Sequence, residues 1–228
     1  MDPDILFEDN HIIVVNKKSS ELVQSDQTGD ESLDVRIKQF LKIKYNKPGN
    51  IFLGVVHRID RPVSGIVVFA KTSKALTRMN NLFKERDLRK VYWAIIQSCP
   101  TEESATLNHF LIRNRRQNKS YAYDHEKPGA KKASLSYELK GNSNRYYFVQ
   151  VELHTGRHHQ IRSQLTKIGC PVKGDLKYGS KRSNPDGSIC LHARQLEFVH
   201  PVKQTNIKII ANPPGGVLWD EFKAVLKD

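Results

Sequence analysis

The spacing of hydrophobic residues changes along the first half of this chain and predicts alternating strands and helices. Continuous apolar runs at residues 12–15, 66–70 and 91–97 are typical of strands, and the second run is typical of a buried central strand. Between them, apolar residues recur every three or four positions from Leu33, and residues 47–50 end that helix. A second helix is predicted to follow an N-cap at Ser73. Its apolar face comprises Ala75, Met79, Leu82 and Phe83.

The second half is richer in strands. Apolar and polar residues alternate over 133–139 and over 147–153, and residues 141–144 between them form a hairpin signal. A helix with Ile161, Leu165 and Ile168 on one face ends at Gly169, and strands at 196–199 and 207–210 precede a final helix. The apolar face of that final helix comprises Leu218, Phe222, Val225 and Leu226. The pattern lacks a regular βαβ repeat and predicts an α+β fold, a mixed, largely antiparallel sheet flanked by helices in a single domain over 1–228.

Charge adds a partner class to this picture. The 228 residues include 37 lysines and arginines against 24 acidic residues, a formal net charge of +13. Such an excess indicates a nucleic-acid partner, although a merely basic soluble protein has the same composition. Three cysteines without a CxxC pair favour a reduced, cytoplasmic setting. No run approaches 18 apolar residues, so no membrane span is expected, and the acidic start is not that of a signal peptide.

The segment HRIDRPVSG at residues 57–65 places one carboxylate between two cations. Asp60 lies between Arg58 and Arg61, with His57 just before them. A carboxylate is ionised at neutral pH and needs no base to act as a nucleophile, and a nearby cation lowers its pKa further. The same arginines could hold phosphates, so the segment indicates chemistry on a polyanion. Without a GxSxG elbow, Ser64 is expected to be a turn residue and not a nucleophile.

A second motif, HTGRHHQIR at residues 154–162, lies where a strand gives way to a helix. Backbone N–H groups at that helix start could bind an anion, and Arg162 could reach a buried carboxylate on a neighbouring strand end. Adjacent His158 and His159 should point about 100° apart on a helix, so a shared metal is not expected, and packing or hydrogen bonding is. Tyr92 taken alone is a core residue. The basic segment 112–119 is either an arm for RNA phosphates or a solvated loop.

Taken together, five motifs resemble RluA-type pseudouridine synthases in order and spacing. They are HRIDRPVSG, KVYWA (90–94), HTGRHHQIR, GDLKYG (174–179) and LHARQLEFVHP (191–201), and the opening ILFEDNHIIVVNK resembles the first strand pair of that family. The resemblance extends from about residue 5 to residue 214. It implies an enzyme that isomerises uridine in structured rRNA or tRNA to pseudouridine, with no metal and no organic cofactor.

The resemblance also implies roles for individual residues. Asp60 matches the essential nucleophile, and whether it attacks the base or acts at the ribose stays open. Arg58 matches the arginine that enters the RNA helix as the target flips out, and Tyr92 the tyrosine that stacks on the base and assists proton transfer at C5. Arg162 matches the arginine that pairs with the aspartate, and Ile161 an apolar residue against the base. Three further residues are expected to contact RNA, with a structural alternative for the last: His57, Arg157 and Arg61.

Departures from the family pattern are local. Val63 replaces the threonine that is usual in the family, and residues 17–20 (KKSS) replace the usual Lys-Pro-Ala-Gly. His158 replaces a threonine or serine. We expect no separate N-terminal S4-type RNA-binding domain, no obligatory protein partner, and a monomer by default. Two rivals are a catalytically silent RNA-binding protein on the same scaffold and a metal-dependent RNA hydrolase, which the histidine spacing disfavours. The RNA and the uridine position are not predicted.

Overall fold

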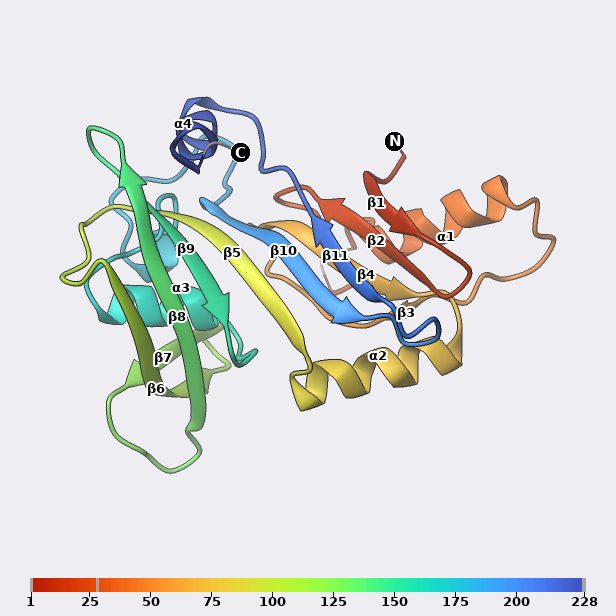
Figure 1. Ribbon diagram of the computed structural model, residues 1–228, viewed down its shortest axis with the longest axis horizontal. Coiled ribbons are helices and arrows are strands. Elements are labelled where there is room, and N and C mark those ends of the chain that lie inside the picture. The colour runs from red at the N-terminus through yellow and green to blue at the C-terminus, as the bar shows by residue number, and fades with distance from the viewer. Residues whose placement is uncertain (1, 28, 227–228) are drawn as a thin grey trace. The chain divides into compact units, whose positions relative to one another are not determined.

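The computed structural model describes residues 2–27 and 29–226, and the chain divides into two compact units (Figure 1). The first unit comprises Met1–Arg89 and Ala193–Pro213, and the second comprises Lys90–His192 and Pro214–Asp228. Strands and helices are interspersed in both units, and the strand pairs of described register within each unit are antiparallel. The predicted α+β class with a mixed, largely antiparallel sheet is therefore confirmed.

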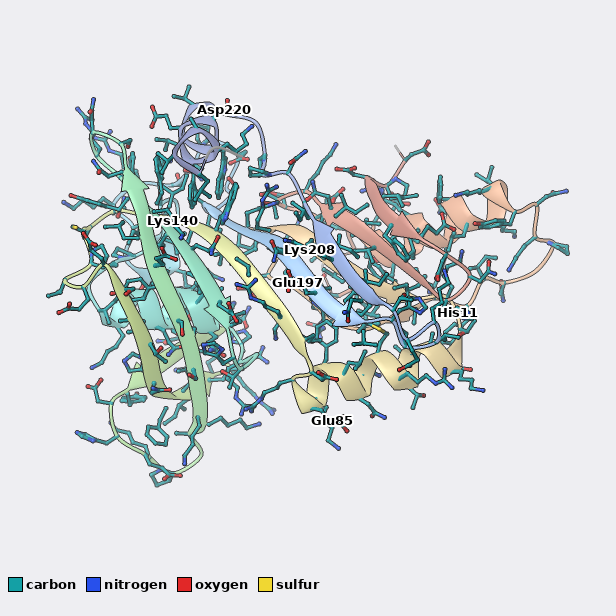
Figure 2. The ribbon with its side chains drawn as sticks, viewed as in Figure 1. His11, Glu85, Lys140, Glu197, Lys208 and Asp220 are labelled. Carbon is teal, nitrogen blue, oxygen red and sulfur yellow. The ribbon has the colours of Figure 1, made fainter. Side chains whose placement is uncertain are left out.

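The first unit is built on strands in the order β1-β2-β4-β10, with β3 paired to β4 and β11 paired to β10. Two helices, α1 and α2, accompany them. Across β10 and β11, Glu197 lies opposite Lys208, and Figure 2 shows these two side chains on the neighbouring strands. The bounds are β1 Ile5–Glu8, β2 Ile12–Lys17, α1 Leu33–Lys44, β3 Gly54–Val55, β4 Ser64–Ala70, α2 Ser73–Glu85, β10 Leu191–Val199 and β11 Asn206–Ile210.

The core of this unit lies between α1 and the central strands. Every residue of β4 is buried, which confirms the central strand predicted from its continuous apolar run. The helix α1 presents Leu33, Ile37 and Leu41 to Val67 and Phe69 of β4. Burying each such side chain contributes about 1.5–3 kcal/mol, so this layer fixes the strand that follows the HRIDRPVSG segment.

The predicted N-cap of α2 was wrong by one residue. Thr72, and not Ser73, has an extended backbone, and its hydroxyl accepts a hydrogen bond from the Ala75 N–H at 3.1 Å. Ser73 already lies inside the helix. Both residue types can cap a helix, so only the backbone conformation decides between neighbours.

The second unit has the strand order β5-β9-β8-β6-β7, with antiparallel neighbours (Figure 1). The predicted hairpin between β8 and β9 is confirmed. The segment 112–119 belongs to a second hairpin, formed by the end of β6, a four-residue turn and the start of β7. The bounds are β5 Leu88–Ile96, β6 Ser104–Asn114, β7 Lys119–Tyr123, β8 Lys131–Asn142, β9 Tyr147–Leu153, α3 Gln160–Lys167, the 3-10 helix η1 Leu176–Tyr178, and α4 Val217–Leu226.

Only part of the apolar face predicted for α4 is buried. Trp219 and Phe222 are the buried residues of this helix, whereas Val225 is 41% exposed. Phe222 stacks on Trp93 of β5 and Phe148 of β9, at ring-centroid distances of 4.7 and 5.0 Å. Aromatic stacking orients the helix so that its largest side chains are buried. A prediction from the spacing of aliphatic residues does not account for this preference. Within the described residues, no helix is long and apolar enough to cross a membrane.

Candidate functional site

Asp60 lies in the first unit, in the loop that joins β3 to β4. The loop ends in a turn in which the Val63 N–H donates to the Asp60 carbonyl at 3.0 Å. The Asp60 side chain is partly buried, and Val63 behind it is 2% exposed. A buried position of this kind accepts the apolar valine that stands here for the usual threonine. The carboxylate is therefore presented by a short loop whose end is anchored in the core.

A buried lysine, Lys17 at the end of β2, holds this loop through its main chain. Its Nζ donates to the carbonyls of Lys18, Glu21 and Arg61 at 2.9, 3.0 and 3.0 Å, and the residue is 1% exposed. Burial lowers the pKa of Lys17 to about 8, against the attraction of the Glu21 and Asp60 carboxylates, which raises it. At neutral pH most Lys17 ammonium groups therefore stay protonated and place a positive charge near Asp60.

The two arginines beside Asp60 differ in what they contact. Arg61 donates from Nε to the Ser20 carbonyl at 3.0 Å and from Nη2 to Asp30 Oδ2 at 2.7 Å. These contacts tie the loop to residues 20–30 and favour the structural alternative for Arg61. Arg58 is exposed. Arg61 is exposed as well, so the two flanking cations differ in the contacts of Arg61 and not in exposure.

His57 is engaged by the body of the first unit. Its ring stacks on Phe83 of α2 with centroids 4.7 Å apart, and its Nε2 accepts a hydrogen bond from the Val68 N–H at 3.2 Å. An Nε2 that accepts carries no proton, so the imidazole is neutral in this arrangement. These contacts hold His57 against β4 and α2, and its expected contact with RNA stays a prediction.

Gly65, the last residue of HRIDRPVSG, is required by close packing. Its φ is +112°, and a Cβ at this position would lie 2.4 Å from the Ala193 carbonyl oxygen of β10. Only glycine accepts both the conformation and the contact. The expectation that Ser64 is a turn residue was wrong, because Ser64 is the first residue of β4 and is 2% exposed.

In the second unit, three side chains singled out by the motifs are buried. Tyr92, in the middle of β5 opposite Val151 of β9, is 9% exposed. Ile161 and Arg162 form the first turn of α3 and are 4% and 5% exposed. A tyrosine and an isoleucine suit contact with a base, whereas a buried guanidinium requires an anionic partner.

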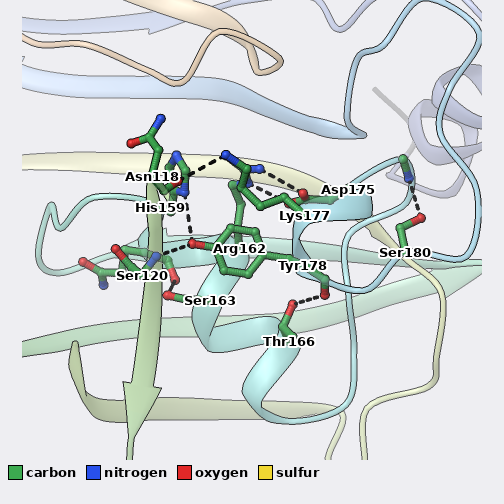
Figure 3. A network of polar contacts seen from close by, with 12 residues as sticks. Asn118, Ser120, His159, Arg162, Ser163, Thr166, Asp175, Lys177, Tyr178 and Ser180 are labelled. Atoms are coloured by element: carbon green, nitrogen blue, oxygen red, sulfur yellow. Dashed lines mark hydrogen bonds and ion pairs between the residues drawn. The ribbon is translucent and has the colours of Figure 1, made fainter. Parts of the chain in front are cut away.

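That partner within the second unit is Asp175, the residue before η1 (Figure 3). Arg162 donates from Nε to Asp175 Oδ2 at 2.6 Å and from Nη2 to Oδ1 at 2.8 Å, and Asp175 is 1% exposed. A bidentate pair of this kind fixes both the position and the plane of the guanidinium. Arg162 thus reaches a buried carboxylate, Asp175, which the sequence analysis did not name, and its pairing with Asp60 stays a prediction.

Tyr178 completes the surroundings of Arg162. The guanidinium carbon lies 4.8 Å from the centre of the Tyr178 ring, and the tyrosine hydroxyl accepts a hydrogen bond from the Ser120 N–H at 2.7 Å. The same hydroxyl lies 3.0 Å from His159 Nδ1 (Figure 3). Burial, followed by the charges of Arg162 and nearby cations, lowers the pKa of His159 to about 2. His159 is therefore neutral under physiological conditions.

The predicted divergence of His158 and His159 was wrong. Their rings are stacked with centroids 3.7 Å apart, because His159 has a left-handed backbone (φ 52°) and precedes the helix as its N-cap. The 100° rule applies only inside a helix. The nitrogens are engaged by protein groups, since His158 contacts Ser120 Oγ at 2.8 Å and Asn118 Oδ1 at 3.1 Å. Over the described ranges, no group of three or more histidine, cysteine or acidic side chains is placed to hold a metal.

Arg157, at the turn before α3, is anchored at both ends. Its backbone N–H donates to Gln160 Oε1 at 2.9 Å, and its Nε donates to the Lys132 carbonyl at 3.0 Å. Gln160 Oε1 also accepts from the Thr155 hydroxyl at 2.7 Å. The start of the helix is thus satisfied partly by its own side chains, and Arg157 leaves the remaining N–H groups of its guanidinium for other acceptors.

Sequence reasoning missed Lys17, Asp175 and Tyr178. Lys17 follows Asn16 at the end of β2, where a polar residue is ordinary, so nothing local marks it as a buried cation. Asp175 and Tyr178 belong to GDLKYG, a motif that was noticed without roles for its residues. Their partners are far away in sequence or on another element, so no spacing rule identifies them.

A family model described as RNA pseudouridylate synthase matches residues 11–167. Ribosomal large subunit pseudouridine synthase C of Rickettsia prowazekii is 30% identical over 213 residues, covering 92% of this chain and 68% of that protein. The uncharacterised RNA pseudouridine synthase YhcT of Bacillus subtilis is 31% identical over 216 residues, with the same two coverages. An uncharacterised RNA pseudouridine synthase of Synechocystis is 31% identical, and the chain spans 65% of its length.

Two solved structures share the fold. Human RNA pseudouridylate synthase domain containing 4 gives a TM-score of 0.78 at 21% identity and covers 98% of this chain and 92% of its own. Human RNA pseudouridylate synthase domain containing 1 gives a TM-score of 0.72 at 22% identity and covers 98% of this chain and 87% of its own. The family match and the 30–31% identical relatives confirm the resemblance to RluA-type enzymes, and the chain belongs to the RNA pseudouridylate synthase family.

Proposed function

We propose that this chain isomerises uridine in structured RNA to pseudouridine, with Asp60 as the nucleophile and without a metal or an organic cofactor. The observation that carries the proposal is the family match over residues 11–167, which contains the whole HRIDRPVSG and HTGRHHQIR segments. The anchoring of the Asp60 loop by the buried Lys17 ammonium supports the assignment, because a nucleophile must be held in a defined position.

The reaction is an isomerisation in which all atoms are conserved. The bond between N1 of the base and C1′ of the ribose breaks, and a bond forms between C5 and C1′. C5 loses its proton, and N1 gains one. Asp60 forms a transient bond to either the base or the ribose and is released unchanged, so no co-reactant is consumed.

The target uridine must leave the RNA stack before its glycosidic bond can be reached. Unstacking costs a few kcal/mol, and an inserted guanidinium together with a stacking ring offsets part of that cost. Arg58 is exposed on the loop and suits the first role. Tyr92 and Ile161 suit contact with the base, and Arg162 keeps the role implied by the motif, the cation that accompanies the nucleophile.

Ribosomal RNA is the first substrate to test. The relative in Rickettsia is named as a synthase of the large ribosomal subunit, and the same name applies to the relative in Vibrio cholerae. We propose a stem-loop of rRNA as the substrate, with tRNA as the second choice, and a protein that acts in the cytoplasm without an obligatory protein partner.

The test is release of tritium from RNA that carries tritium at uridine C5. Purified protein with EDTA should release tritium from an rRNA transcript while leaving the chain intact, because the C5 proton is lost and no backbone bond is cut. Asp60→Asn should release none, and Glu85→Gln, which removes an exposed carboxylate of the same unit, should match the wild type.

Each rival has its own outcome in this assay. RNA binding without tritium release from any rRNA or tRNA fraction would identify a silent binding protein and overturn the proposal. Cleavage of the RNA that EDTA abolishes would identify the metal-dependent hydrolase. Full release by Asp60→Asn would refute the nucleophile while leaving the reaction in place.

A further inference from the structure

The second unit contains a cavity of about 430 Å³ that the proposed chemistry does not use. It lies between the β6–β7 hairpin, the start of β8 and the turn before α3. Its floor includes Leu111 and Ile112 of β6. Its wall comprises four cationic side chains, those of Arg113, Arg115, Lys131 and Arg157, and the imidazole of His158.

No acidic side chain lines this cavity. Among the ion pairs recorded for the described residues, none involves Arg113, Arg115 or Lys131. Arg113 instead donates to the neutral amide of Asn118 at 3.1 Å, and Arg157 donates to the Lys132 carbonyl. Cations gathered around one cavity repel one another unless an anion is present, so the arrangement is suited to an anionic ligand.

The chemistry of the wall distinguishes a polyanion from a small anion. Four permanent cations, spread over three elements, exceed what one carboxylate or one phosphate can engage. Exposed Arg116 follows Arg115 in the same turn and extends the positive surface beyond the cavity. A phosphodiester backbone presents successive negative groups at this scale, and nucleic acids are bound mainly through such contacts.

Two hydrogen bonds and one cation–π contact connect the wall of the cavity to Arg162. His158 Nδ1 lies 2.8 Å from the Ser120 hydroxyl, and the Ser120 N–H donates to the Tyr178 hydroxyl (Figure 3). The Tyr178 ring in turn lies over the Arg162 guanidinium. An anion held in the cavity would thus be held at a fixed position relative to Arg162, through rigid side chains of the same unit.

We infer that this cavity is a docking site for the phosphodiester backbone of the RNA substrate, read without regard to base sequence. The inference rests on the proposed function, since it names a second region where the same RNA is held. Segment 112–119 had two interpretations, an arm that contacts RNA and a solvated loop. This inference adopts the first.

The test measures RNA affinity as a function of salt concentration. Arg113→Ala combined with Arg115→Ala removes two exposed cations, and the probe is a fluorescein-labelled RNA hairpin with a uridine-containing loop. We expect affinity to fall at least about tenfold, and the slope of log K against log salt to lose about 1.5 units, as for two phosphate contacts. The loss should be equal for a hairpin with changed bases, and kcat at saturating RNA should stay within about twofold.

Two further variants act as controls. Lys140→Ala combined with Arg145→Ala removes two cations from the β8–β9 hairpin of the same unit, and it should leave the slope near the wild-type value. Arg113→Lys combined with Arg115→Lys keeps the charge and should retain most of the slope. These pairs separate a local phosphate contact from a general change in net charge.

The outcomes separate this inference from the proposed function. An unchanged slope in the Arg113/Arg115 variant of a catalytically active protein would overturn the docking site, and an acidic protein partner would then become the alternative. A loss confined to one base sequence would overturn the backbone contact. A reduced slope in a protein that releases no tritium from any RNA would refute the proposed function and keep the docking site.

Discussion

Asp60 and Asp175 are both aspartates near a buried cation, and the structure uses the two cations differently. Lys17 binds three main-chain carbonyls, including that of Arg61, and so fixes the loop that carries Asp60. Arg162 binds the side chain of Asp175 itself through two hydrogen bonds. The first arrangement positions a partly buried carboxylate through its backbone, and the second commits both oxygens of a fully buried carboxylate to one guanidinium.

The first arrangement positions a reactive group, the Asp60 carboxylate. The second positions a cation, the Arg162 guanidinium. A carboxylate whose oxygens are both hydrogen-bonded to a guanidinium is a weaker nucleophile, because the two charge-assisted hydrogen bonds stabilise its negative charge. A buried ion pair of this kind adds little net stability over apolar packing but costs much when one partner is removed. We therefore expect Asp60 variants to lose chemistry and Asp175 variants to lose structure.

The largest expected effect is on turnover in Asp60→Asn. Removing the nucleophile should lower pseudouridine formation at least about a thousandfold, while the free energy of unfolding changes by less than about 1 kcal/mol. Tritium release and urea unfolding measure the two quantities. A variant that unfolds easily but retains turnover would reverse the comparison with Asp175.

Asp175→Asn should show the opposite pattern. Leaving the Arg162 guanidinium buried without its carboxylate is expected to lower the free energy of unfolding by about 3–5 kcal/mol. Urea unfolding measures the change, and Asp186→Asn, an exposed carboxylate of the same unit, should cost less than about 1 kcal/mol. Unchanged stability in Asp175→Asn would show that the pair is not structural.

Lys17→Met tests whether the Asp60 loop is held through its backbone. The variant leaves three partly buried carbonyls without their shared donor, so unfolding should be easier by about 2–3 kcal/mol and turnover should fall more than tenfold. Lys18→Met removes the exposed neighbouring lysine and should change neither quantity by much. Wild-type turnover in Lys17→Met would show that the loop keeps its position without the ammonium.

Per pH unit, the smallest expected effects are on the pH dependence of stability, which lies in different pH windows for the two regions. The pKa of His159 is lowered to about 2 from 6.5, so the unfolded chain binds the extra proton, and stability is lost as pH falls below about 6.5. The pKa of Lys17 is lowered to about 8 from 10.5, so its contribution makes stability rise between about pH 8 and 10.5.

Unfolding of His159→Asn and Lys17→Met over a pH series measures these contributions. The stability of the wild type relative to His159→Asn should fall by up to about 1.4 kcal/mol per pH unit below pH 6.5. Asparagine is chosen because it tolerates the left-handed backbone of this position. A difference that is constant from pH 7 to pH 4 would contradict a buried neutral histidine.

Hydrophobic periodicity predicted most of the helices and strands because burial acts on each of them separately. The continuous run of β4 and the alternation of β8 follow directly from which faces are covered. The misplaced elements have specific causes. Thr72 replaced Ser73 as a cap through backbone conformation, and Trp219 turned α4 toward aromatic partners on other strands.

The sequence by itself determined the family and the identity of the reactive segments, because the motifs carry the residue types that the chemistry requires in a readable order. Only the tertiary structure decided which groups hold those residues. Lys17 meets the Arg61 carbonyl across 44 positions, and Arg162 meets Asp175 from a different element. Such contacts depend on where folded segments meet in space, and burial then makes each of them strong, which no local pattern of residues encodes.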